Sequence, residues 1–227
     1  MCPRPRFASL QAAKRDAILA AAAKEFAERG FEAASYNRLI ERAGVSKGAM
    51  YYYFDDKQDL YVTTVGHAVA VLQAAIGELD DFDDADDFWT ALIDLYQRVL
   101  VFFLEEPVMA ALLKGVTHPP PAAASGVDRS QSQAMERFAK YFEAVIHQGV
   151  RVGGLRDDVP ADLLLEILLG MGDAMDRWTI DRFETLDEKQ IQTLLRTNTQ
   201  MFMRVAAPLS LVQRWEGQFL RPAAEPL

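Results

Sequence analysis

Residues 35–57, SYNRLIERAGVSKGAMYYYFDDK, decide the fold, because they predict two short helices joined by a tight turn. Ser35 and Ser46 stand where a side-chain hydroxyl can accept a hydrogen bond from the first turn of a helix. Gly44 lies between the two segments, where the backbone needs a residue that adopts a left-handed conformation easily. The stretch therefore predicts a helix-turn-helix.

The second helix of this motif has an unusual outward face. Met50 and Phe54, four residues apart, mark its buried side. The other side combines one cation, two very small residues and three phenols, whereas a solvated face is usually rich in Glu, Lys and Gln. Small residues let a helix approach base edges, lysine can bind guanine or phosphate, and tyrosine hydroxyls can bind phosphate. We predict a DNA recognition helix, and the alternative is a helical corner with a partly buried tyrosine cluster. The outward residues are Lys47, Gly48, Ala49, Tyr51, Tyr52 and Tyr53.

Several features around this motif agree with one protein family. They run from about Ala17 to Leu60 and comprise ILAAAAKEFAERGFEAAS, the turn AGVSKG, then MYYYF and DDKQDL. In these residues the chain resembles the tetracycline-repressor-like (TetR) transcriptional regulators. Beyond residue 60 the resemblance is one of architecture, because ligand domains diverge in this family. Ala49 and Tyr52 stand where the family often has Thr and His, which concerns individual contacts rather than the role of the segment.

The resemblance implies residues that would contact a DNA operator with two-fold symmetry. Ser35, Asn37 and Lys57 flank the recognition helix, and Asn37 can read adenine while the other two hold phosphate. With the outward residues of the helix and its cap, the predicted DNA-binding set is Ser35, Tyr36, Asn37, Ser46, Lys47, Gly48, Ala49, Tyr51, Tyr52, Tyr53 and Lys57.

The charge distribution is compatible with this function although the whole chain is acidic. The net charge of the 227 residues is −9, which by itself argues against a nucleic-acid partner. Residues 1–60, however, hold ten Lys or Arg against eight Asp or Glu, and the acidity lies in the remainder. Residues 1–9, which include Arg4 and Arg6, are not expected to form regular structure, and they can serve as a basic arm that reaches DNA or remain a disordered tail.

The rest of the chain predicts further helices and no strand. No segment shows the alternating pattern of a half-buried strand, and HPPPAAASG at 118–126 predicts a loop. We expect an all-α fold with a three-helix helix-turn-helix domain at 1–54 and a helical ligand-binding and dimerisation domain at 55–227. A helix beginning at Lys57 joins them. Apolar residues recur at helical spacing at about 10–29, 57–78, 88–104, 128–149, 158–182 and 187–205, and again after Pro208.

Composition favours a cytoplasmic protein that is neither an enzyme nor a metalloprotein. No apolar run reaches the roughly 18 residues of a membrane span, and the N-terminus lacks the apolar stretch of a signal peptide. Cys2 is the only cysteine. The acidic run at 80–87 lacks the Gly and Glu of a calcium loop, and it favours the start of the next helix. We expect no cofactor, and the alternative functions are a helical-bundle enzyme or an interaction scaffold. The three histidines, His67, His118 and His147, have no paired-ligand spacing.

Two features of the C-terminal part predict its partners. The segment at 160–182 is apolar on nearly all sides, so we expect a homodimer formed by it and the helix at 187–205, where Gly170 and Gly172 permit close approach. A small-molecule effector would bind between the segments at 88–104, 128–149 and 158–182, although core packing alone also explains their large side chains. Nearby Glu166, Asp173 and Asp176 favour a cationic or hydrogen-bond-donating aromatic compound. The predicted lining residues are Trp89, Tyr96, Phe103, Met109, Phe142, Met171, Met175 and Trp178.

Overall fold

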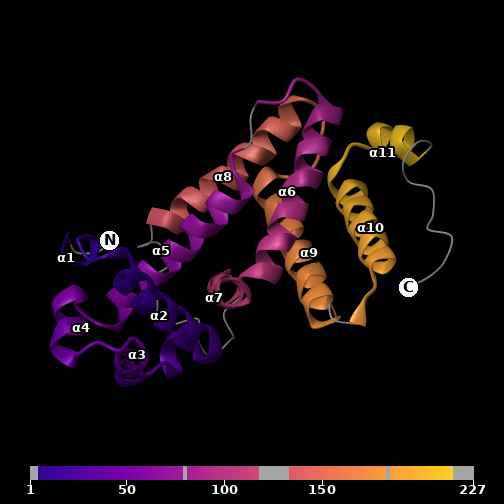
Figure 1. Ribbon diagram of the computed structural model, residues 1–227. Helices are drawn as coiled ribbons and strands as arrows, with labels where there is room; N and C mark the ends of the chain where they lie inside the picture. Colours follow the sequence, from indigo (N-terminus) through magenta and orange to yellow (C-terminus); the bar gives the residue numbers. More distant parts are fainter. Residues whose placement is uncertain (1–4, 79–80, 118–132, 183–184, 217–227) are drawn as a thin grey trace. The chain divides into compact units, whose positions relative to one another are not determined.

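The computed structural model describes residues 5–78, 81–117, 133–182 and 185–216, and in these ranges every regular element is a helix (Figure 1). The all-α prediction is therefore confirmed. The chain forms two compact units, each made from two separate stretches of sequence. Unit 1 comprises Met1–Ala75 and Phe102–Ala139, and unit 2 comprises Ile76–Val101 and Lys140–Leu227.

Unit 1 contains the helix-turn-helix and the helices packed on it. Its core is formed by apolar residues that recur on one side of each helix, and Ile18, Met50 and Phe54 have no exposed surface. The helices are α1 (Pro5–Ala8), α2 (Ala12–Ala33), α3 (Tyr36–Arg42), α4 (Lys47–Tyr53), nearly all of α5 (Lys57–Ile76), and α7 (Pro107–Thr117).

The local signals of the helix-turn-helix predicted its structure correctly. The Ser35 hydroxyl accepts a hydrogen bond from the Arg38 N–H at 3.5 Å, and the Ser46 hydroxyl accepts one from the Ala49 N–H at 3.1 Å. Gly44 has a φ of 64°, which residues with a side chain rarely adopt. The two caps fix where α3 and α4 begin, and the turn at Gly44 separates the two helices.

Helix α7 packs along α2, although the two are far apart in sequence. Ala22 and Ala23 of α2 are buried, and side chains as small as these permit two helices to approach closely. The buried residues of α7 are Ala110, Leu112, Leu113 and Val116. The compact unit around the helix-turn-helix therefore includes a segment that follows it by some 50 residues.

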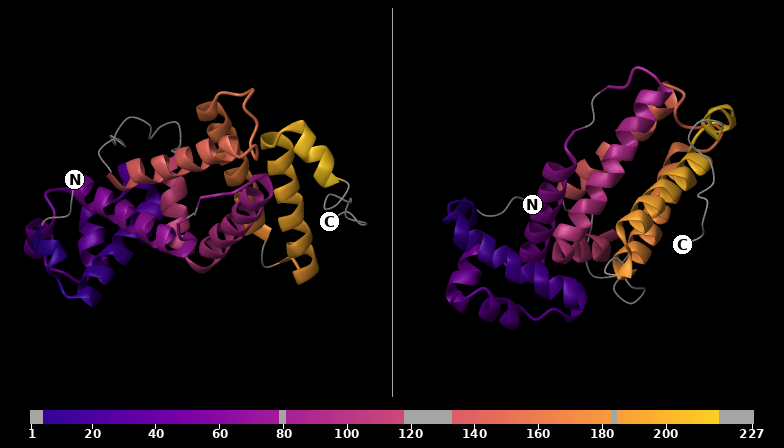
Figure 2. Two further views of the ribbon diagram at one scale, coloured as in Figure 1. Left: turned by 90° about the horizontal axis from the view of Figure 1, so that it is seen from above. Right: turned by 45° about the vertical axis from the view of Figure 1, so that its right-hand side comes forward.

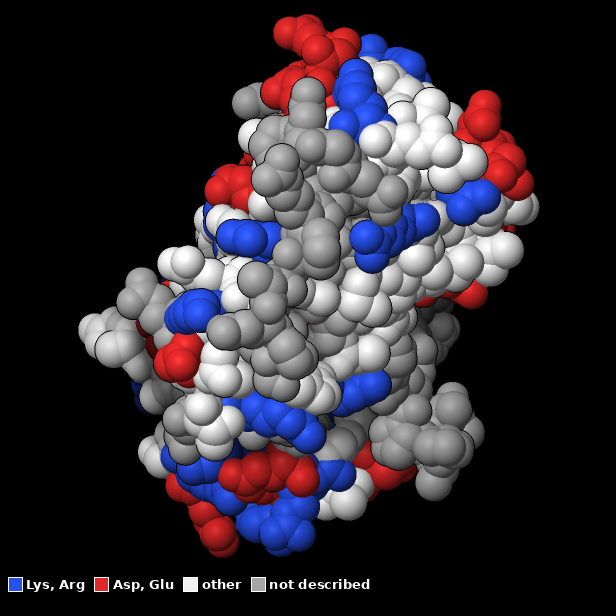
Figure 3. All heavy atoms as spheres, turned by 90° about the vertical axis from the view of Figure 1, so that its right-hand side faces the viewer, with Lys and Arg blue, Asp and Glu red and all other residues white. Residues whose placement is uncertain are grey.

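Unit 2 contains most of α6 (Ala85–Glu105) and of α8 (Gln133–Arg151), together with α9 (Ala161–Arg182), α10 (Glu188–Ala206) and α11 (Leu209–Glu216). Helix α10 lies beside α9 (Figure 2). On the side of α10, Lys and Arg side chains stand apart from one another, with areas of uncharged atoms between them (Figure 3). The buried core of the unit consists of Phe82, Phe88, Trp89, Val145, Ile146, Leu155, Leu164, Met203, Ala206, Ala207, Leu211, Val212 and Trp215.

A glycine corner at the end of α8 packs on Phe88. A Cβ atom at Gly149 would lie 2.6 Å from Phe88 Cζ, and one at Gly154 would lie 2.7 Å from Phe88 Cδ1. Both distances are shorter than van der Waals contact, so a side chain at either position would force Phe88 to move. Gly149 and Gly154 therefore serve close packing, whereas Gly153 between them has a φ of 71°. The helix expected to end between Gly149 and Gly154 ends at Arg151.

The acidic run at 80–87 caps the start of α6, as predicted. Asp84 Oδ1 accepts hydrogen bonds from the N–H groups of Asp86 and Asp87, both at 2.9 Å. Helix α10 begins with a reciprocal cap, in which the Asp187 carboxylate accepts from the Gln190 N–H and the Gln190 side chain accepts from the Asp187 N–H.

Two further expectations are answered by the described residues. Residues 5–8 form a helical turn, so the expectation of no regular structure in this part of the N-terminal arm is wrong. Helix α5 is long and apolar enough to cross a membrane by length and composition, but 56% of its most apolar window is buried, as in the core helix of a folded protein. Arg4, Cys2, His118, the predicted loop at 118–126 and the predicted helix start near 128 lie outside the described residues.

Candidate nucleic-acid interface and effector region

Helix α4 presents the outward face that its sequence predicted. Tyr51 and Tyr52 are 48% and 52% exposed, which is unusual for residues of this size, while Met50 is completely buried. Lys47 and Gly48 are exposed, and Ala49 and Tyr53 are half-buried. The face thus combines a cation, a helix surface without bulky side chains and two phenol rings that are accessible from outside.

The tyrosines of α4 are held by ring contacts on both sides. Tyr51 meets Tyr36 of α3 with ring centroids 5.3 Å apart, and Tyr52 meets Tyr53 at 5.4 Å. Both pairs are edge-to-face, the favoured geometry for aromatic rings. These contacts restrict the rotamers of the exposed phenols before any partner binds.

Tyr36, also predicted to contact DNA, has its hydroxyl oxygen buried without a hydrogen-bond partner among the described residues. Burial, followed by the nearby Tyr51, Asp56 and Asp59, raises its pKa to about 12. The ring positions Tyr51, and the hydroxyl is not accessible to phosphate in this conformation.

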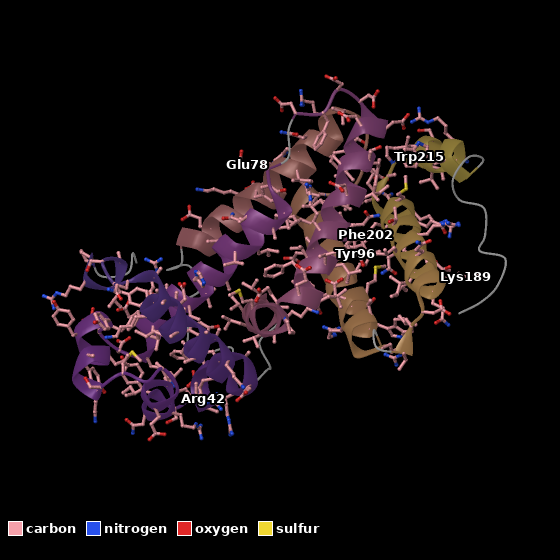
Figure 4. The ribbon with its side chains drawn as sticks, in the orientation of Figure 1. Arg42, Glu78, Tyr96, Lys189, Phe202 and Trp215 are labelled. Carbon is pink, nitrogen blue, oxygen red and sulfur yellow. The ribbon has the colours of Figure 1, made fainter. Side chains whose placement is uncertain are left out.

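A buried carboxylate attaches α3 to α2. Glu25 has no exposed surface, and its Oε1 accepts hydrogen bonds from the Ser35 N–H at 3.1 Å and from Arg38 Nε at 2.9 Å. Its Oε2 forms an ion pair with Arg42 Nη1 at 3.2 Å, although the angle is not that of a hydrogen bond. Arg42, labelled in Figure 4, also pairs with Glu28. Burial alone would raise the pKa of Glu25, but the two hydrogen bonds and the two arginine charges outweigh it and lower the pKa.

Lys57 holds the start of α5 to the end of α2. Its Nζ donates to the backbone carbonyl oxygens of Phe31, Glu32 and Ala34 at 2.8, 3.1 and 3.3 Å, and it lies 4.6 Å from the centroid of the Phe31 ring. All three donors of the ammonium group are used. Lys57 therefore has a structural role, which the prediction of a phosphate contact did not include.

Two other predicted contact residues lie at the N-terminal end of α3. Ser35 is half-buried and caps the helix, while its N–H is donated to Glu25. Asn37, in the first turn of α3, is exposed. Asn37 is thus available for a base or a phosphate, whereas the hydroxyl of Ser35 already accepts a hydrogen bond within the protein.

The N-terminal turn contributes residues that sequence reasoning did not place next to α4. Phe7 is 2% exposed, and its ring centroid lies 4.7 Å from that of Phe54 and 6.3 Å from that of Tyr53. The guanidinium carbon of Arg6 lies 4.5 Å from the centroid of Tyr52. The signal that could have found this arrangement is a single aromatic residue within a charged, proline-containing segment.

In unit 2, three polar side chains from α6, α9 and α10 come together in an apolar interior. The Tyr96 hydroxyl accepts a hydrogen bond from Asn198 Nδ2 at 2.9 Å and hydrogen-bonds to Asp176. Asn198 and Asp176 are 4% and 5% exposed. Burial, followed by the charge of Asp176, raises the pKa of Tyr96. Tyr96 faces Phe202 across α6 and α10, with ring centroids 5.5 Å apart (Figure 4).

The structure does not gather all the predicted effector residues. Trp89 is a core residue, 1% exposed, and its Nε1 donates to the Gly154 carbonyl oxygen at 2.8 Å. Trp178 is 40% exposed and lies under the Arg182 guanidinium, 4.7 Å from its centre. Phe103 and Met109 belong to unit 1 and are half-buried there. Tyr96, Phe142, Met171 and Met175 are half-buried in unit 2.

Among the described residues, no group of three or more His, Cys, Asp or Glu side chains is arranged to hold a metal ion. His67 is half-buried on α5, and burial lowers its pKa.

Comparison with known proteins places this surface in a family. The family described as bacterial regulatory proteins, tetR family, matches residues 18–63, which span α3 and α4 and their supports. The chain is 25% identical to the HTH-type transcriptional repressor BepR of Brucella suis over 167 residues, covering 72% of this chain and 79% of the relative. It is 25% identical to the repressor AcnR of Corynebacterium diphtheriae over 158 residues, covering 66% of this chain and 73% of the relative. The structure of a tetR family transcription regulator from Shewanella sp. PV-4 superposes on this chain with a TM-score of 0.70 at 22% identity. The match covers 86% of this chain and 98% of that protein.

Proposed function

We propose that this chain, which belongs to the tetR family of bacterial regulatory proteins, represses transcription by binding a palindromic operator through α4 until a small molecule releases it. The observation that carries the proposal is the outward face of α4, with two half-exposed tyrosines, an exposed lysine and an exposed glycine. The start of this helix is fixed by the Ser46 cap. Such a face suits the major groove. Both relatives named above are repressors, which supports repression as the direction of control.

Recognition would combine base contacts from α4 with phosphate contacts around it. Gly48 and Ala49 let the helix axis approach the base edges, and Lys47 at its N-terminal end can reach guanine or phosphate. The exposed phenols of Tyr51 and Tyr52 can bind phosphate oxygens beside the groove. Loss of a base contact should cost about 1–3 kcal/mol at one operator position, whereas loss of a phosphate contact weakens all sequences about equally.

The test of operator binding is selection of duplexes from a random pool with the purified full chain. The selected sites should show dyad symmetry, with half-sites one helical turn apart. Lys47→Ala should relax the preference at one symmetric pair of positions. A selection that returns no symmetric site would contradict the proposal.

Two-fold symmetry requires a dimer, and α9 carries an apolar stripe suited to form it. Leu163, Ile167 and Trp178 are 47%, 39% and 40% exposed, and the exposed Gly170 and Ala174 lie between them on the same side of the helix. A Cβ atom at Gly170 would meet nothing within 4 Å, so the helix backbone is accessible there. We propose that a second copy of the chain covers this stripe.

A charge placed on the stripe tests the dimer. Ile167→Glu should convert the protein to a monomer in light scattering at micromolar concentration and abolish binding to a full operator, because a desolvated carboxylate is costly in an interface. Leu169→Glu is the matched control, since Leu169 is 44% exposed but points to the opposite side of α9. If both variants stay dimeric, the interface lies elsewhere.

The effector is proposed to bind in unit 2 near Tyr96, Asn198 and Asp176. Polar side chains that converge within apolar surroundings are the usual recognition centre of a small-molecule site. The buried carboxylate of Asp176 favours an effector that carries a positive charge or a hydrogen-bond donor on an aromatic body. To shift a population from 1:99 to 99:1, the effector must bind the released form about 5.5 kcal/mol more tightly.

A thermal-shift screen with aromatic amines and matched neutral compounds tests the effector class. Asp176→Asn should lower the affinity of any cationic effector at least tenfold in calorimetry, and the exposed Glu166→Gln on the same helix should not. Equal affinity of both variants would exclude Asp176 from the site. Release of the operator by the same compound, measured by fluorescence anisotropy, connects binding to repression.

A further inference from the structure

We propose that Arg6 is an additional DNA-contacting residue, whose guanidinium group binds a phosphate of the operator strand beside the groove that receives α4. The inference rests on the proposed DNA binding and extends the interface beyond the residues of the helix-turn-helix. It assigns a function to the N-terminal turn α1, which packs against α4 in unit 1 (Figure 1).

The first observation is that α1 has a fixed position. The Phe7 ring is buried against Phe54, itself completely buried, and against Tyr53 at the end of α4. Burying a phenylalanine side chain contributes about 1.5–3 kcal/mol. The turn is closed by hydrogen bonds from the Ser9 hydroxyl to the Arg6 carbonyl oxygen at 2.9 Å and from the Leu10 N–H to the Phe7 carbonyl oxygen at 3.1 Å. Arg6 is thus anchored by the residue that follows it.

The second observation is where this anchor places the charge. The Arg6 guanidinium carbon lies 4.5 Å from the ring centroid of Tyr52, which is the most exposed tyrosine of α4. The planar guanidinium group contacts an aromatic ring through its face, and its N–H donors lie in its plane. Contact with Tyr52 therefore leaves the edges of the group available, and two parallel N–H groups match two oxygens of a phosphate.

The third observation concerns the other cations near α3 and α4. Arg38 and Arg42 pair with Glu25, and Lys57 is saturated by three carbonyl oxygens. Within the described ranges, no acidic side chain pairs with Lys47 or with Arg6. Among the described residues next to this face, Arg6 and Lys47 are therefore positive charges without an acidic partner. A polyanion beside α4 would be attracted to both of them.

The experiment compares the full-length Arg6→Ala variant with the wild type on the selected operator, at a series of KCl concentrations. Each phosphate contact contributes about 0.9 to the slope of log affinity against log salt, so two copies in a dimer should lower the slope by about 1.8. Relative to 1 M salt, a slope of about 0.9 corresponds at 0.1 M salt to about an eightfold loss of affinity for each contact. The loss should be equal on operators that differ in their flanking bases. Arg6→Lys should keep most of the slope and recover only part of the affinity.

The matched control is Arg15→Ala, an arginine of α2 with a 38% exposed side chain and a charge that acts on His67 of α5. It should leave both affinity and slope unchanged. If Arg6→Ala binds with the affinity and the salt slope of the wild type, this inference is overturned while the proposed function stands. A loss of affinity that depends on the flanking bases would also overturn it, because it would indicate that Arg6 contacts bases in a groove. Failure of the wild type to bind any selected duplex would overturn the proposed function and this inference with it.

Discussion

Replacement of Glu25 by Gln should destabilise unit 1 by about 2 kcal/mol at neutral pH. The carboxylate has no exposed surface, and it accepts one hydrogen bond from a backbone N–H and one from the Arg38 guanidinium. Hydrogen bonds that involve charged groups contribute about 1.5–3 kcal/mol each. Breaking a buried ion pair costs about 3–5 kcal/mol, but the side chains of Arg38 and Arg42 are 43% and 36% exposed and can turn toward water, which reduces the loss.

The pH dependence of this stabilisation has a definite sign. Because the pKa of Glu25 is lowered in the folded protein, its contribution is fully present above the unfolded value of about 4.5 and is lost as the pH falls through the lower folded value. Protonated Glu25 resembles the Gln side chain. The difference in unfolding free energy between wild type and Glu25→Gln should therefore decrease as the pH is lowered from 7 toward 3.5.

The assay is urea denaturation followed by circular dichroism at several pH values in this range. Glu28→Gln is the matched control, because Glu28 pairs with the same Arg42 but its side chain is 41% exposed, and it should cost less than 1 kcal/mol. A difference for Glu25→Gln that stays constant from pH 7 to pH 3.5 would refute the assignment of the stabilisation to the carboxylate charge. So would equal losses in the two variants.

Three other substitutions test the packing described above. Lys57→Met should destabilise unit 1 by about 1 kcal/mol and weaken operator binding, because three carbonyl oxygens at the end of α2 lose their donor; unchanged denaturation would contradict this role. Gly149→Ala should cost about 1–3 kcal/mol by forcing its Cβ against Phe88, whereas Gly115→Ala, with nothing within 4 Å, should be neutral or stabilising in the same thermal melts. Trp89→Phe should lower the free energy of unfolding by about 1–3 kcal/mol, because the Gly154 carbonyl oxygen loses its hydrogen-bond donor. The affinity for the effector, measured by calorimetry, should not change, and a large loss of affinity would show that Trp89 belongs to the binding site.

The parts of the structure that sequence predicted well are those decided by neighbouring residues. Ser35, Gly44 and Ser46 act within one turn of their own position, through a cap or a backbone angle. Met50 and Phe54 follow from helical spacing on a single short helix. Signals of this range need no knowledge of what packs against the segment, so they hold whatever the rest of the chain does.

The parts that sequence did not predict depend on contacts between distant residues. Glu25 appears in the sequence as one of several charges on α2. Its complete burial depends on Ser35, Arg38 and Arg42, which follow it by 10 or more residues. Trp89 fits an aromatic pocket by composition, yet a carbonyl oxygen 65 residues away makes it a core residue. Phe7 has no periodic neighbours at all, so its burial against Phe54 is visible only in three dimensions. The DNA-contacting and effector-binding sets remain predictions for the experiments above.

The packing of α7 along α2 has a consequence for how the protein is made. Helix α2 ends at Ala33 and α7 ends at Thr117, so the ribosome must add 84 residues between completing the one and completing the other. At about 5–20 residues per second this delay lasts roughly 4–17 s, during which the side of α2 that α7 will cover has no partner from the same chain. The alanine-rich surface of α2 suits this interval, because small side chains expose little apolar area to other nascent chains.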